Sequence, residues 1–283
     1  MNLNTRWLQV EATTKCNAWC PACGRNQGGF GLSPHLVIED LDLSIYHNHL
    51  ESMPNLEVID FCGTYGDAIA AHNIVELTRL SKQYAKKIVV RTNGSLRSTT
   101  WWQEYAALFK DIDHEIWFCI DGLKDTHSIY RQGTDFDTIM ANAATVIAQG
   151  CSAVWQFIPW EHNQHQIKDC IRLSQQLGFE RFEFIKNVRR DFVPRHWKTG
   201  KVFEIKPWQH NSEFNMIEQP RTQLDVQDCR HLTQPSLYLN ANGKLSNCCF
   251  FNTGICATTA DQLPNIEQEL NNPRDICLHY CGH

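Results

Sequence analysis

Short β-branched or apolar runs alternate with longer segments of helical period between residues 7 and 185. This order is typical of strand–helix units that build a parallel sheet, because each helix crosses over and packs back on the sheet. The pattern predicts an α/β fold with strands at 7–11, 56–61, 87–92, 115–120, 153–157 and 181–185. Helices are predicted between them, at 41–52, 74–84, 99–108, 136–149 and 166–177.

Composition excludes several protein classes. Hydrophobic residues make up 42% of the 283 residues and charged residues 20%, which excludes a disordered chain. No apolar stretch approaches the ~18 residues that span a bilayer, and the start lacks a signal peptide, so a cytoplasmic protein is expected. The formal charge of -5 disfavours a nucleic-acid partner. The 13 cysteines, an odd number without a secretion signal, indicate metal binding rather than disulfides.

The unusual motifs of the chain all follow predicted strands. In a right-handed strand–helix array, the loops at the carboxyl ends of the strands share one rim, where such folds place their chemistry. The motifs lie at 16–25 after the first strand, 62–67 after the second, 93–94 after the third, 121–122 after the fourth and 159–163 after the fifth. We therefore expect these loops to form one site.

Three cysteines lie close together in the first of these loops. Cys16, Cys20 and Cys23 form a C-x3-C-x2-C motif, whose thiolates can bind one small inorganic centre. A structural zinc site needs a fourth protein ligand, whereas a [4Fe-4S] cluster held by three cysteines leaves one iron open for another ligand. The spacing favours the cluster, and a zinc ion completed by a distant His or Cys is the alternative.

This cysteine motif, after the first strand of a six-unit array, resembles that of the radical S-adenosylmethionine superfamily. The resemblance extends from about residue 7 to residue 185 and implies a partial (β/α)6 TIM-like barrel. It also implies that the amino and carboxylate groups of S-adenosylmethionine bind the open iron. One electron from the cluster would cleave the sulfonium, and the resulting 5′-deoxyadenosyl radical would abstract a hydrogen atom from the substrate.

The resemblance assigns cofactor contacts to the other loops. The stretch 62–67 is similar to the family's Gly-Gly-Glu motif, which places Gly66 and Asp67 at the methionine amino group, with Asp in place of the usual Glu. Arg131 would pair with the methionine carboxylate, because a guanidinium suits bidentate carboxylate binding. The remaining expected contacts are Asn93 after the third strand, Asp121 after the fourth and Asn163, at the ribose, after the fifth.

Each of these residues also has an ordinary structural interpretation. Residues 66–67 suit a turn, Arg131 a solvated helix start, and Asn163 a helix N-cap. Their shared position on one rim favours the functional interpretation. The sequence departs from the family at Ala22, where an aromatic residue often covers the adenine, so Trp19 or an aromatic from another loop is expected to replace it.

A second cysteine group lies near the C-terminus. Cys229 and Cys248 form a C-x13-G-x4-C pattern around an Asn-Gly turn, which predicts a hairpin of residues 236–239 and 244–246. The pattern resembles the auxiliary-cluster domain called SPASM, in its shortened twitch form. Its implied [4Fe-4S] ligands are Cys229, Cys248, Cys277 and Cys281, with Cys249 or Cys256 as replacements, and a structural zinc ribbon is the alternative.

These patterns divide the chain into a barrel at 1–186, a linker at 187–228 whose aromatic residues pack over the rim, and an auxiliary domain of hairpin and helix at 229–283. Among the other cysteines, Cys62, Cys119, Cys151 and Cys170 lie in apolar surroundings and are interpreted as core residues.

Two classes of function follow. The first is a radical enzyme whose auxiliary cluster aids oxidation or holds the substrate, either a ribosomally made peptide or a small molecule such as an aminocyclitol. A flavodoxin- or ferredoxin-type donor would supply the electron, and a separate protein would bind a peptide's leader, because Cys16 comes too early for a recognition domain before it. The second is a non-enzymatic zinc-binding scaffold. No catalytic acid or base is assigned.

Overall fold

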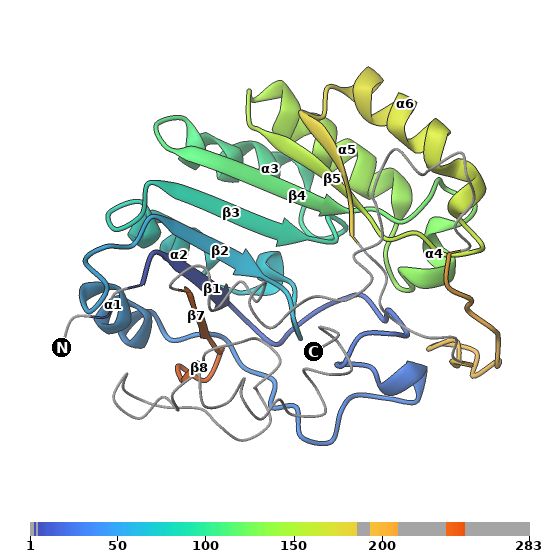
Figure 1. The fold of residues 1–283 in the computed structure, drawn as a ribbon, viewed down its shortest axis with the longest axis horizontal. Coiled ribbons are helices and arrows are strands. Elements are labelled where there is room, and N and C mark those ends of the chain that lie inside the picture. The colour runs from blue at the N-terminus through green and yellow to red at the C-terminus, as the bar shows by residue number, and fades with distance from the viewer. Residues whose placement is uncertain (1–2, 4, 186–192, 209–235, 247–283) are drawn as a thin grey trace, which may run out of the picture.

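The computed structural model describes residues 3, 5–185, 193–208 and 236–246. Their strands form one sheet in the order β6-β5-β4-β3-β2-β1-β7-β8, and every neighbouring pair is parallel except β7 with β8. The sheet stays open between β6 and β8, which confirms the predicted partial α/β barrel (Figure 1). The strands are β1 (Trp7–Glu11), β2 (Val58–Cys62), β3 (Lys87–Thr92), β4 (Asp113–Cys119), β5 (Ala153–Phe157), β6 (Arg181–Phe184), β7 (Ser236–Leu239) and β8 (Leu245–Ser246).

Helices connect the first six strands and cover one face of the sheet (Figure 1). Each predicted helix is present, and the shifts in its bounds have local causes. The helix predicted at 74–84 ends at Ser81, for example, and continues as a turn in which the Tyr84 N–H donates to the Ser81 carbonyl at 3.0 Å. The short α4 is too brief to show a period in the sequence. The helices are α1 (Leu43–Glu51), α2 (Ile74–Ser81), α3 (Thr99–Ala106), α4 (His127–Tyr130), α5 (Phe136–Ala148) and α6 (Ile167–Leu177).

The main core lies between the helices and the sheet. Large aromatic side chains fill it, and the rings of Trp102 on α3 and Phe118 on β4 lie 5.6 Å apart between centroids. Trp155 on β5 is also completely buried, and its indole N–H donates to the Ile120 carbonyl at 2.9 Å. This aromatic core fixes the ends of the strands that carry the loops of the candidate site. None of the helices in the described part of the chain is long and apolar enough to cross a membrane.

The predicted hairpin is present, and its first strand joins the main sheet. β7 pairs in parallel with β1 in a register that places Ser236 beside Trp7. Between β7 and β8 the chain turns at residues 240–243, where the Gly243 N–H donates to the Asn240 carbonyl at 2.9 Å. The position of β7 beside β1 was not expected, because the sequence pattern predicts which residues pair locally but not which distant strand they join.

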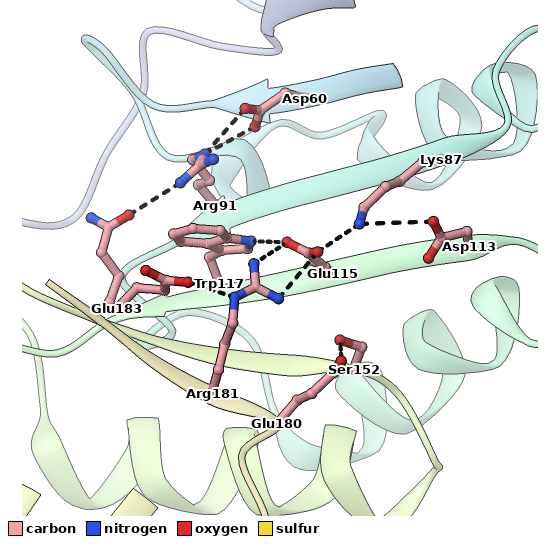
Figure 2. A network of polar contacts seen from close by, with 11 residues as sticks. Asp60, Lys87, Arg91, Asp113, Glu115, Trp117, Ser152, Glu180, Arg181 and Glu183 are labelled. Atoms are coloured by element: carbon pink, nitrogen blue, oxygen red, sulfur yellow. Dashed lines mark hydrogen bonds and ion pairs between the residues drawn. The ribbon is translucent and has the colours of Figure 1, made fainter. Parts of the chain in front are cut away.

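The other face of the sheet carries a charged network. Ile88 and Val90 lie in the helix-side core, so the alternation of a strand turns Lys87 and Arg91 to the opposite face. Figure 2 shows the guanidinium groups of Arg91 and Arg181 against the Trp117 ring, with their Cζ atoms 4.0 and 5.2 Å from its centroid.

Carboxylates hold this network in place. Arg91 donates to Asp60 at 3.0 Å, and Glu115 accepts from both Lys87 at 2.6 Å and Arg181 at 2.7 Å (Figure 2). Burial raises the pKa of Glu115, but the hydrogen bonds from Arg181 and Lys87 outweigh it and lower the pKa to about 2. The inner face of the open barrel is therefore polar and preorganised.

Candidate active site

The cysteine loop follows β1 and is folded by its own backbone. The Cys23 N–H donates to the Cys20 carbonyl at 3.1 Å, and the Asn26 side chain donates to the same carbonyl at 3.2 Å. The Ala18 N–H points at the Cys16 sulfur from 3.3 Å. The three cysteines are in the reduced thiol form, and Cys20 is buried while the other two are half-buried.

Each cysteine sulfur borders a loop from a different strand. The Asn93 side-chain amide, after β3, lies 3.8 Å from the Cys16 sulfur. The Cys23 thiol donates to the Thr64 carbonyl, after β2, at 3.8 Å. The sulfur of Cys20 lies 3.9 Å from Nη1 of Arg131, which follows α4 beyond β4. The structure therefore brings residues of four predicted loops together around the three thiols.

An ion pair holds Arg131 beside Cys20. Its Nε donates to Oδ2 of Asp121 at 2.5 Å, while Oδ1 of Asp121 accepts the Ile158 N–H at 2.7 Å. Asp121 is completely buried, and 12% of the Arg131 side chain is exposed. The carboxylate bonds to the inner nitrogen of the guanidinium, and the outer nitrogen Nη1 faces the Cys20 sulfur.

A neutral histidine, His127, holds the backbone of Asp121. Burial lowers the pKa of His127 to about 3, so its ring nitrogens accept and donate as an uncharged imidazole. Its Nδ1 accepts the Asp121 N–H at 3.2 Å, and its Nε2 lies 3.0 Å from the Thr134 hydroxyl. His127 thus fixes the backbone of Asp121 without adding charge. Its helical position gave no sequence signal for this role.

Gly66 and Asp67 lie where the loop after β2 meets the cysteine loop. Both carboxylate oxygens of Asp67 accept hydrogen bonds within the protein, from the Thr92 hydroxyl at 2.8 Å and from the Asn93 N–H at 2.7 Å. Asp67 therefore joins the loops after β2 and β3. The backbone of Gly66 approaches Thr13 so closely that an added Cβ would lie 1.9 Å from its carbonyl oxygen.

Gly66→Ala is expected to force the loop after β2 away from the segment after β1 that contains Thr13 and Lys15. Because the atoms that an added Cβ meets are backbone carbonyl oxygens, they cannot move away as a side chain would. We expect a loss of about 2 kcal/mol in the free energy of unfolding, together with weaker binding of any ligand held between the loops. Urea unfolding measures the first effect.

Gly24→Ala is the matched control, since its Cβ would meet only the Tyr65 side chain, at 3.6 Å. This substitution in the same site should change the free energy of unfolding by less than about 0.5 kcal/mol. Equal destabilisation by the two alanines would contradict the steric argument.

Asn163 lies in the loop after β5 and is completely buried. Its Oδ1 accepts the Trp160 N–H at 2.7 Å, and its Nδ2 donates to the Ile158 carbonyl at 3.1 Å. The side chain thus closes its own loop rather than capping the helix that follows.

Aromatic and apolar side chains enclose the cysteine loop. Trp197, from the segment 193–208, stacks on Trp19 with ring centroids 5.5 Å apart and planes 5° apart. The linker aromatic therefore packs over the rim, as the sequence predicts. Further apolar residues surround Cys20 in one cluster, namely Ala18, Tyr130, Ile158, Trp160 and Ile205.

Sequence reasoning missed two buried charged residues at this rim. Arg25 donates through Nη1 to the Thr14 carbonyl and, at 3.4 Å, to the Tyr65 carbonyl, so it ties the cysteine loop to the loop after β2. Glu11, the last residue of β1, is 1% exposed. Burial raises the pKa of its carboxyl to about 7, against the lowering effect of its hydrogen bonds. A single Arg or Glu beside a motif gives no periodic signal, so neither stood out.

The site meets the chemical requirements of a cluster held by three thiolates. The thiols share one loop, lie in an apolar cluster that limits water, and have the Arg131 cation beside them. Burial raises the pKa of Cys20 to about 11, so a cationic centre is needed to stabilise its thiolate. Within the described residues, no three His, Cys, Asp or Glu side chains are gathered as ligands of a single metal ion. Cluster ligands need no such convergence, because each binds a different iron.

The second predicted cysteine group is not part of the described structure. Cys229, Cys248, Cys249, Cys256, Cys277 and Cys281 all lie outside the described residues, as do the helix predicted for the auxiliary domain and most of the linker.

No protein-family model matches the sequence, and no curated protein sequence matches it. Solved structures do share its architecture. SuiB from Streptococcus suis, bound to S-adenosylmethionine, superposes with a TM-score of 0.61 at 11% identity, over 89% of this chain and 62% of SuiB. The chain shares the fold of SuiB. anSMEcpe with bound S-adenosylmethionine has a TM-score of 0.51 at 16% identity, over 64% of this chain and 50% of its own.

A further SuiB structure, bound to the precursor peptide SuiA, has a TM-score of 0.58 at 10% identity over 89% of this chain. The chain spans 62% of SuiB and half of anSMEcpe. At these low identities the likeness establishes the shared fold.

Proposed function

We propose that this chain is a radical S-adenosylmethionine enzyme. The observation that carries the proposal is a guanidinium that a buried carboxylate holds beside the three-cysteine loop, with Nη1 of Arg131 lying 3.9 Å from the Cys20 sulfur. An anionic group bound next to a cluster at this loop would find a fixed cation whose Nη1 faces the Cys20 sulfur. The shared fold of SuiB and anSMEcpe supports the same reading.

In this proposal Cys16, Cys20 and Cys23 would hold a [4Fe-4S] cluster to which S-adenosylmethionine would bind. The cluster, reduced by an external donor, would supply the electron for cleavage of the sulfonium and so for removal of a hydrogen atom from the substrate. Arg131 holds the methionine carboxylate, and Asp121 fixes the guanidinium. The backbone at Gly66 receives the methionine amino group.

The other predicted cofactor residues act through the loops they join. Asp67 binds the backbone of Asn93, whose side chain reaches the Asn17 side chain at 2.8 Å and borders Cys16. Asn163 keeps the loop after β5 folded, so any ribose contact in this chain would come through that loop.

The non-enzymatic zinc scaffold is the alternative proposal. A structural zinc ion needs a fourth protein ligand beside Cys16, Cys20 and Cys23, whereas a [4Fe-4S] cluster can be held by three cysteines. Metal analysis of the purified protein distinguishes the two proposals.

We further propose a second [4Fe-4S] cluster on Cys229, Cys248, Cys277 and Cys281, which aids oxidation or holds the substrate. β8 ends two residues before Cys248, so this part of the chain begins at the edge strand beside β7.

The proposed substrate is a ribosomally made peptide. The likeness to SuiB, which has been solved with its precursor peptide SuiA, supports this class. The polar inner face around Arg91 and Trp117 also suits a substrate rich in hydrogen-bonding groups (Figure 2). A flavodoxin- or ferredoxin-type donor would supply the electron, and a separate protein would bind a leader peptide.

Anaerobic reconstitution with iron and sulfide tests the function. The proposal predicts about eight irons per chain from two clusters. When the reconstituted chain is reduced in the presence of S-adenosylmethionine, it should form 5′-deoxyadenosine with or without added substrate. Chromatography quantifies this product. Zinc in the purified protein, with no deoxyadenosine after reconstitution, would support the scaffold instead.

A further inference from the structure

The carboxylate of Glu11 is surrounded by hydrogen-bond donors from two distant parts of the chain. It accepts backbone N–H groups of Thr64 at 3.0 Å, Tyr65 at 3.2 Å and Gly66 at 2.8 Å. The hydroxyl of Tyr238 on β7 donates to the same carboxylate. Three successive amides of the loop after β2 thus point at a single side chain at the end of β1.

This arrangement fixes the carbonyl groups of the same loop. A trans peptide is planar, and its C=O points away from its N–H. Because the N–H groups of residues 64–66 point toward Glu11, the carbonyls of residues 63–65 point away from it. Two contacts agree with this geometry: the Thr64 carbonyl accepts the Cys23 thiol at 3.8 Å, and the Tyr65 carbonyl accepts Arg25 at 3.4 Å.

We propose that Glu11 is a positioning residue that turns these carbonyls toward the cysteine loop, where they accept hydrogen bonds from the ammonium group of S-adenosylmethionine. The inference rests on the proposed function and adds to it a residue of β1 that lies outside the cysteine loop. As a thiolate ligand of the cluster Cys23 would no longer donate to the Thr64 carbonyl, and that oxygen could accept the ammonium group instead. Tyr238 extends the arrangement to β7.

Glu11→Gln tests orientation rather than volume, since glutamine has nearly the same shape. One of its two end atoms is an NH2 donor, which would face backbone N–H donors, so at least one peptide of the loop must rotate. Glu11→Asp keeps both acceptor oxygens on a shorter side chain and should restore part of the function. Tyr238→Phe removes one of the donors and leaves the three backbone bonds.

The measurement is equilibrium binding to the cluster-reconstituted full chain, by anaerobic calorimetry at about pH 8, where Glu11 is ionised. Two ligands are compared, S-adenosylmethionine and its analogue without the amino group. Glu11→Gln is expected to weaken binding of S-adenosylmethionine by roughly 10- to 100-fold, while binding of the analogue changes by less than about threefold. Glu11→Asp and Tyr238→Phe should lie between Glu11→Gln and the original chain.

Asp60→Asn is the matched control. Asp60 is a buried carboxylate on the same face of the sheet, bonded to Arg91 and not to the loop. Its loss should lower stability but keep the affinity ratio of the two ligands. A Glu11→Gln chain with the original ratio would overturn the inference.

Failure of the proposed function has a different signature. If the original chain binds neither S-adenosylmethionine nor the analogue, the proposed function itself is wrong. If only Glu11→Gln fails to fold, Glu11→Asp and Tyr238→Phe provide the same ratio test. Amide hydrogen exchange of residues 64–66 without ligand gives an independent readout, and equal exchange rates in Tyr238→Phe and the original chain would overturn the role of Tyr238.

Discussion

Cys20→Ala is expected to abolish formation of 5′-deoxyadenosine in the reconstituted chain. Cys20 is the buried member of the three cysteines and lies against Arg131. Without its thiolate, the proposed cluster has two protein ligands in the first loop and should not persist, because such clusters depend on their full set of cysteines. Bound iron should fall from about eight to about four per chain. Colorimetric iron analysis and chromatography of the products measure both effects.

Cys170→Ala is the matched control for this experiment. Cys170 lies on α6, is as buried as Cys20 and is also a free thiol, but it packs in the helix-side core. Its replacement should cost about 1 kcal/mol of stability and leave iron content and product formation unchanged. Retention of full iron and cleavage in Cys20→Ala would contradict the proposed ligand set.

Asp121→Asn is expected to lower the free energy of unfolding by about 3 to 5 kcal/mol, because it leaves the Arg131 cation buried without its counterion. Asp121 is completely buried, so solvent does not screen the loss. Asparagine keeps the shape and can still accept the Ile158 N–H, which isolates the effect of charge. Anaerobic urea unfolding followed by tryptophan fluorescence provides the measurement.

The double variant Asp121→Asn with Arg131→Met separates stability from binding. Removal of both charges should recover most of the lost stability, since a buried ion pair replaced by apolar groups is often neutral. Affinity for S-adenosylmethionine should remain low in the double variant, because the guanidinium is absent. A loss below about 1 kcal/mol in Asp121→Asn would show that the pair is effectively hydrated.

Much of the fold was predictable because it depends on local patterns. The bounds of β1, β3 and β5 agree with prediction, since each is a short run between clear breaks. The proximity of the cysteine loop to the loops after the other strands was also predictable, because parallel strands place their carboxyl ends at one rim. From that rule we expected Arg131 and Asn93 near the cysteines, and the structure places Arg131 beside Cys20 and Asn93 beside Cys16.

The rest depends on interactions between distant residues. Glu11 at the end of a strand gave no sign that three amides and Tyr238 would surround it. The pairing of β7 with β1 could not be predicted for the same reason. The sequence predicts that Lys87 and Arg91 lie in one strand, but the partners of these two charges lie on β2, β4 and β5 and could not be predicted (Figure 2).

The pairing of β7 with β1 has a consequence for biosynthesis. Glu11 and Tyr238 are 227 positions apart, so β1 gains one of its two neighbours in the sheet only after the long segment between them has been synthesised. Until then its backbone N–H and C=O groups on that side are an exposed edge, which can pair with another nascent chain. We expect late closure of this edge to be a slow step in folding, because contacts so distant along the chain form slowly.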